Sequence, residues 1–419
     1  MNFMQSVGAF TIVGVTMMIS ACGGEANYSF ADVQPLHNGI FIDDAVEGLE
    51  YQRSNGEKGV TLKGGRYSYK SGEFITFHVG ALELGSRDVS SVITPRELAQ
   101  GVTQIEDPLI NNRVRLMLAL DTNSERIGIQ IDEAMRQNAV SWKNSIDFSK
   151  SEAAFVDEVN SVTNGMITQL PTAAEANAHF SKSLRCAYSG GYQGGWSVPD
   201  SNESSGYVGA MIQANGFVVV MGDGQTVGSQ EDSVLYVLGD HDINTKSYLF
   251  RNDGFYYYDR ATAALTLVTD GVSISGTGTS IAYDKIVGSF VNGTQVGSYT
   301  LSRADASSNA AYRFTGFGDD TTGMTIGMII MDIDPDGKIS GLIHDIRDTT
   351  VQPRLEGSAD FVSGEVSIRV EMPDEVSIVS GNINFNDTSV PSQLTWENEA
   401  GDVTYGQVRL DGCQLQAID

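Results

Sequence analysis

The segment IGMIIMDI (326–333), followed directly by DPDG (334–337), contains the pattern on which the fold class depends. Its apolar and β-branched residues are typical of a strand, and the Asp-Gly pair is a strong signal for a hairpin turn. Similar pairs occur at 215–216, 253–254 and 292–293. Many short strands joined by such turns predict an antiparallel barrel or sandwich. The turn spacing of roughly 40 residues also fits propeller blades, but no blade signature repeats, so a propeller is less favoured.

The segments before this β-rich part have other patterns. Residues 186–419 follow the strand pattern, whereas residues 93–185 read as a short helical subdomain. Three S/T-x-x-E capping boxes, which mark helix starts, begin there at Thr94, Ser149 and Thr172. The sequence therefore predicts a mainly β chain with a helical insert between two β parts.

Residues 37–92 read as a small all-β module, because short aromatic and β-branched runs alternate with Gly and Asn. The module contains aromatic, aliphatic and glycine residues that shape a fold and perform no chemistry: Val46, Gly48, Leu49, Tyr51, Gly65, Tyr67, Tyr69, Gly72, Ile75, Phe77, Gly80, Leu84 and Gly85. With these residues it resembles a small β-sandwich module of outer-membrane and surface lipoproteins from marine gammaproteobacteria. The larger antiparallel β-barrel or sandwich domain of residues 186–419 is similar in architecture to the Gly-rich barrels of Gram-negative surface lipoproteins.

Residues 1–21 have the apolar run and small-residue end of a signal peptide. The stretch ISAC (19–22) resembles the lipobox of bacterial lipoproteins, which implies that Cys22 begins the mature chain and carries the lipid, palmitate included. An ordinary signal peptide is the alternative. Gly23 rather than Asp follows the cysteine, and the family's sorting rule then implies the outer membrane, with the chain facing the periplasm or the cell surface. Residues 22–36 are a polar tether, and two or more acyl chains hold a protein stably on a membrane.

The formal net charge of −27 limits the partners of the chain. A nucleic-acid-binding protein needs clustered Lys and Arg, and the acidic residues here are spread along the whole chain. The membrane contact is therefore expected through the lipid, and the expected ligand is a polysaccharide or a protein.

The sequence contains three cysteines, and assigning Cys22 to the lipid leaves two, Cys186 and Cys413. An even pair in an exported protein suggests one disulfide, here Cys186–Cys413, joining the first and last strands of the C-terminal domain. Two free thiols are the alternative. Trp196 lies near Cys186 in the sequence and is expected to pack against the disulfide.

Asp332, Asp334 and Asp336 form the best metal candidate, because a D-x-D-x-D-G run resembles the start of a calcium loop. Position 12 of that loop is Ile343 rather than Glu, and strands flank the run. A hairpin turn explains these residues better, so no metal and no cofactor is expected.

No nucleophile, zinc or phosphate-binding motif occurs in the sequence. This favours a lipid-anchored cell-surface protein that binds or adheres and does not catalyse. The alternatives are a hydrolase of cell-wall or other polysaccharide, whose carboxylates carry no motif, and a purely structural envelope protein.

Overall fold

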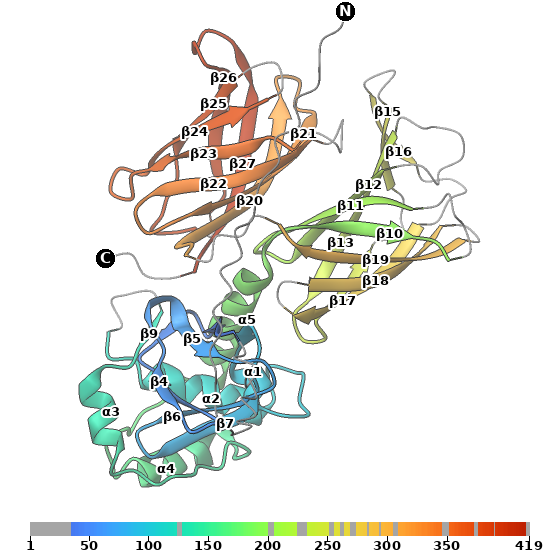
Figure 1. Cartoon of the computed structure of the whole chain (residues 1–419). Coiled ribbons are helices and arrows are strands. Elements are labelled where there is room, and N and C mark those ends of the chain that lie inside the picture. The colour runs from blue at the N-terminus through green and yellow to red at the C-terminus, as the bar shows by residue number, and fades with distance from the viewer. Residues whose placement is uncertain are drawn as a thin grey trace, which may run out of the picture. The chain divides into compact units, whose positions relative to one another are not determined.

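The chain is mainly β, as the alternating patterns predict, with helices between two β parts (Figure 1). The structure is a computed structural model. It describes residues 35–415 except 124–127, 200–204, 224–232, 251–254, 260–263, 269–273, 283–284, 293–294, 305–308, 346–351, 373–375 and 389. Residues Leu36–Asp419 form one unit, and Cys22 lies outside the described residues.

The N-terminal strands form small sheets that share a core with the helices. One sheet has the order β5-β1-β8, a second has the order β4-β3-β6-β7, and β2 pairs with β9. Phe41 and Phe77 from the sheets pack in one apolar cluster with Met117 and Phe155 from the helices. The strands are β1 His37–Phe41, β2 Val46–Glu47, β3 Glu50–Arg53, β4 Lys58–Val60, β5 Arg66–Tyr69, β6 Phe74–Val79, β7 Leu82–Asp88, β8 Val92–Ile93 and β9 Ile129–Gln130.

Two of the three expected capping boxes are present. Thr94 and Thr172 each exchange hydrogen bonds with the Glu three residues later. The third expectation is wrong: the N-cap of that helix is Ser151, whose side chain makes no capping hydrogen bond, and Ser149 Oγ donates to Asp147 Oδ1 at 2.6 Å. In the described part of the chain, no helix has the length and apolar character needed to span a bilayer. The helices are α1 Pro95–Leu98, α2 Pro108–Ala119, α3 Glu133–Ala139, α4 Glu152–Val162 and α5 Ala173–Tyr188.

The C-terminal residues form a closed barrel of eight antiparallel strands, β20–β27. In β24 every second residue is buried and those between are exposed, which is the alternation of a barrel wall. Pairing from Tyr312↔Gln414 to Asp320↔Gly406 joins the first and last strands. A large apolar cluster that includes Trp396 fills the interior. The strands are β20 Tyr312–Asp320, β21 Thr325–Ile333, β22 Lys338–Asp345, β23 Arg354–Ala359, β24 Glu365–Glu371, β25 Val376–Asn382, β26 Ser392–Asn398 and β27 Thr404–Gln414.

In the sequence, the residues between α5 and the barrel form a second β structure, a ten-stranded antiparallel sheet. An additional β12–β13 pairing joins its two arms, so β10–β14 and β17–β19 form a ring from which the β15–β16 hairpin extends. Trp196 is buried inside this sheet against Phe290, 5.9 Å between ring centroids, so its expected packing against the disulfide is wrong. The strands are β10 Gly190–Ser197, β11 Ser205–Ile212, β12 Phe217–Asp223, β13 Ser233–Asp242, β14 Ser247–Phe250, β15 Phe255–Asp259, β16 Ala264–Val268, β17 Ile274–Ala282, β18 Lys285–Asn292 and β19 Gln295–Arg303.

The C-terminal end of α5 connects the helices to both β structures. Cys186 on α5 forms a disulfide with Cys413 on β27, with a Cα–Cα distance of 5.5 Å. The disulfide is confirmed, but it starts from a helix and not from the first strand. Arg303 Nη2 donates to Ala187 O at 2.7 Å, and Arg313 Nη1 donates to Ser189 O at 3.3 Å. These arginines satisfy carbonyls at the helix end, which have no partner within the helix.

Candidate functional site

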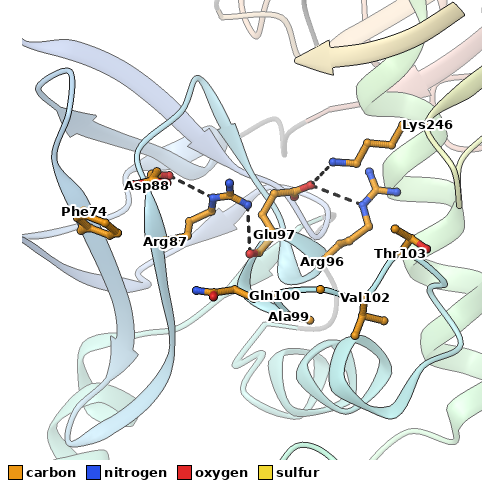
Figure 2. A pocket seen from close by; sticks show the side chains of 11 residues that line it. Phe74, Arg87, Asp88, Arg96, Glu97, Ala99, Gln100, Val102, Thr103 and Lys246 are labelled. Carbon is orange, nitrogen blue, oxygen red and sulfur yellow. Dashed lines mark hydrogen bonds and ion pairs between the residues drawn. The ribbon is translucent and has the colours of Figure 1, made fainter.

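A polar pocket of about 430 Å³ lies at strand β7, helix α1 and the turn between β13 and β14 (Figure 2). Its charged lining consists of Arg87 and Asp88 on β7, Arg96 and Glu97 on α1, and Lys246 on the turn. Ligand sites favour such junctions of structural units, and roughly 300–1,000 Å³ is their usual volume. This pocket is therefore the candidate functional site.

The capping box places Glu97 at the centre of the pocket. Pro95 begins the helix, and the backbone N–H of Thr94 donates to Glu97 Oε2 at 3.0 Å. The other carboxylate oxygen, Oε1, accepts from Lys246 Nζ at 2.7 Å and lies 3.5 Å from Arg96 Nε. One side chain thus starts the helix and links it to the β13–β14 turn.

The charge of Glu97 is balanced inside the protein. Burial disfavours its carboxylate, but the positive charges of Lys246 and Arg96 outweigh that effect and lower the pKa of Glu97 below its ordinary 4.5. Arg96 also donates through Nη2 to Tyr188 Oη at 2.9 Å and through Nη1 to Ile243 O. Glu97 is therefore held as an ion-paired carboxylate, which suits a structural role better than proton transfer.

Arg87 differs from the other two cations of the pocket. Its Nε donates to Asp88 O and its Nη1 to Glu97 O, each at 3.2 Å, and both acceptors are backbone carbonyls (Figure 2). No carboxylate among the described residues forms an ion pair with it. The guanidinium is thus held in a fixed orientation beside the pocket while its charge is not neutralised.

A second ionisable cluster lies where the β1–β2 turn contacts α5. His179 Nε2 is 3.2 Å from Asp43 Oδ1, and its Nδ1 is 3.8 Å from Asp44 Oδ2. Burial lowers the pKa of His179, but the two carboxylates outweigh burial and raise it to about 9. Ser183 Oγ donates to Asp44 Oδ1 at 2.6 Å. Because Ser183 Oγ donates to Asp44 and to the His179 backbone carbonyl, with no hydrogen bond to the His179 ring, these residues do not form the arrangement of a Ser-His-Asp triad.

Two further histidines are buried and neutral. His241 is stacked on Tyr248 with ring centroids 4.5 Å apart, and Tyr188 packs edge-on at 4.4 Å. His344 Nδ1 lies 3.2 Å from Tyr207 Oη across the contact between the barrel and the ten-stranded sheet. Burial is the main reason that the pKa of each falls to about 4. Neither residue lines the pocket.

The residues of the calcium-loop candidate are used by the fold. Both carboxylate oxygens of Asp332 accept from Arg313, Oδ1 at 2.8 Å and Oδ2 at 2.9 Å. The backbone carbonyl of Asp334 accepts from the Gly337 N–H at 2.9 Å in the β21–β22 hairpin turn, and Asp336 Oδ1 accepts from the Lys338 N–H at 3.4 Å in the same turn. In residues 35–415, leaving aside the undescribed gaps, no group of three Asp, Glu, His or Cys side chains could hold a metal ion.

The sequence did not predict any of the residues that line the pocket as site residues. It recognised Thr94 to Glu97 as a helix start, and nothing in the sequence connects Glu97 with Lys246, which lies 149 positions away. The only local signal of the pocket was the capping box itself.

Comparison with known proteins gives weak, fold-level likenesses only. No protein-family model and no curated protein matches the chain. An AttH-like protein from Nitrosomonas europaea is similar at 9% identity and a TM-score of 0.19, over 54% of this chain and 92% of that one. Kievitone hydratase from Nectria haematococca is similar at 9% identity and a TM-score of 0.19, over 56% of this chain and 92% of that one. Transferrin binding protein B from Haemophilus parasuis is similar at 6% identity and a TM-score of 0.16, over 55% of this chain and 76% of that one.

Proposed function

We propose that this chain is a lipid-anchored protein of the bacterial outer membrane that binds a ligand and does not catalyse a reaction. The lipobox-like stretch 19–22 and the glycine after Cys22 support the anchor and its membrane. The acidic chain has no basic cluster for an anionic bilayer, so the lipid supplies the attachment.

One observation carries the binding function. Arg87 lines a polar pocket with a charge that no carboxylate of the described residues neutralises, while the neighbouring Glu97 is fully engaged by Lys246 and Arg96. A guanidinium that is held by hydrogen bonds but forms no ion pair in a preformed pocket favours recognition of a ligand. A general acid would need a raised pKa, whereas that of Glu97 is lowered. The two ion pairs of Glu97 thus favour binding over acid catalysis by this residue.

The anchor is tested by labelling cells with a palmitate analogue and separating their membranes. The natural chain is expected to incorporate the label and to sediment with the outer membrane. Cys22→Ser should lose the label and be released or remain an unprocessed precursor. Thr11→Ser, inside the apolar run, is the matched control and should behave as the natural chain. Normal labelling and maturation of Cys22→Ser would contradict the anchor.

The binding function is tested separately on the mature chain without its lipid. The protein is applied to an array that carries both glycans and envelope proteins. Saturable binding to one class, reduced by Arg87→Gln, is the expected result. Hydrolysis of an arrayed glycan would favour the hydrolase alternative, and no binding to any class would favour a structural role.

A further inference from the structure

We propose that the pocket recognises the carboxylate of an acidic sugar, such as a uronic acid residue of a polysaccharide, and that Arg87 selects it. This inference rests on the binding function proposed above and specifies the ligand. It follows from the charges, the geometry and the polar groups of the pocket.

The charge of the pocket fits a ligand with one negative charge. Lys246 Nζ and Arg96 Nε lie 2.7 Å and 3.5 Å from Glu97 Oε1, so these cations already face a carboxylate. Arg87 forms no ion pair with a carboxylate of the described residues. Counted together, the three cations of the lining and its two carboxylates, Asp88 and Glu97, leave one net positive charge. A sugar carboxylate carries one charge and matches it. A phosphate monoester carries nearly two charges, which exceeds the one net positive charge of the lining.

The geometry of Arg87 favours a planar acceptor. Its two hydrogen bonds to Asp88 O and Glu97 O use Nε and one hydrogen of Nη1, and they fix the plane of the guanidinium. Donors on Nη1 and Nη2 remain for a ligand. A guanidinium fork held in this way matches a carboxylate, and its prior ordering reduces the entropy lost on binding.

Other groups of the pocket suit a polyhydroxylated ring. Asp88 is exposed beside Arg87, so its carboxylate can accept hydrogen bonds from sugar hydroxyls. Gln100 donates one hydrogen bond to Ser86 O at 3.2 Å and retains its side-chain oxygen as an acceptor. The exposed Thr103 hydroxyl also lines the pocket. A peptide carboxyl terminus would match Arg87 but would make no use of these hydroxyl-recognising groups.

The test is titration calorimetry on the mature chain without lipid, with trigalacturonate as the probe. Galactotriose serves as the neutral ligand, and trialanine and inorganic phosphate represent the rival classes. Trigalacturonate should bind at least about ten-fold more tightly than each of the other three. Arg87→Gln should weaken it by about ten-fold or more, because a hydrogen-bonded charge is lost. Arg369→Gln, on the barrel surface where Arg369 pairs with Glu371 and Glu399, is the matched control and should bind normally.

A second variant keeps the test decisive if Arg87→Gln does not fold. Arg87→Lys retains the charge but loses the planar fork, so an intermediate loss of affinity is expected. Equal binding of galactotriose, tighter binding of phosphate or trialanine, or unchanged affinity in both Arg87 variants would overturn the acidic-sugar assignment. A neutral glycan that binds on the array would leave the proposed binding function intact while this inference fails.

Discussion

Replacement of His241 by Phe should stabilise the protein, although it alters a fully packed site. The ring of His241 is 8% exposed and lies between Tyr188 and Tyr248. Neither ring nitrogen has a hydrogen-bond partner among the described residues. Phe has a similar shape and keeps the aromatic contacts. Removing unsatisfied buried polar atoms should increase the free energy of unfolding at pH 7.5 by about 1–3 kcal/mol.

The same variant should also change the pH dependence of stability. Burial first, and then the charge of Arg96, lower the pKa of His241 from 6.5 to about 4. The unfolded chain therefore takes up this proton before the folded chain does. Above pH 6.5 this proton uptake removes no stability from the folded state, and the loss grows as the pH falls from 6.5 to 4, where it reaches about 3 kcal/mol. The Phe variant lacks this dependence.

Urea unfolding followed by fluorescence at pH 7.5, 5.5 and 4.0 measures both effects. His241→Gln is the matched control, because it keeps unsatisfied polar atoms, loses the ring and should therefore be destabilised. The reasoning is refuted if His241→Phe is less stable than the natural protein at pH 7.5, or if both lose stability equally between pH 7.5 and 4.0.

Three other outcomes are expected. Unfolded mature protein should show no free thiol before reduction, and breaking the Cys186–Cys413 disulfide should lower the free energy of unfolding by about 5 kcal/mol, as chemical denaturation measures. Arg313→Met should lower it by about 3 kcal/mol, because the buried Asp332 carboxylate would lose the two hydrogen bonds that Arg313 donates to it; adding Asp332→Leu should restore most of the loss, and failure to do so would contradict a buried ion pair. Millimolar calcium should leave the melting temperature unchanged, whereas a rise of several degrees abolished by Asp334→Ala would reveal a metal site.

Local patterns predicted the elements of this fold well. The capping boxes at Thr94 and Thr172 and the Asp336-Gly337 turn are formed by residues close together in the sequence, so their signals are complete within a few positions. The alternation in strands such as Glu365–Glu371 likewise depends on the chain alone. The mainly β fold with its helical insert could therefore be predicted.

Features that depend on pairing between distant segments could not be predicted. Barrel closure requires the register of Tyr312 with Gln414, and the sequence contains no signal for that pairing. The prediction for the packing of Trp196 was wrong for the same reason, because distant strands of the ten-stranded sheet enclose that residue. The pocket depends on Lys246 reaching Glu97 from a distant turn. The disulfide could be predicted because assigning Cys22 to the lipid left only two cysteines to pair.

The bond between α5 and β27 also determines how the molecule transmits mechanical tension. If the N-terminus is tethered and the chain after Cys413 is pulled, the covalent bond Cys186–Cys413 carries the force directly from α5 to β27. The cysteines are 227 positions apart, and the segment between them, which includes the ten-stranded sheet, is shielded from that force. Without the bond, it could extend by roughly 800 Å. An oxidised molecule is thus a short, stiff connector, and a reduced one is a long, compliant one.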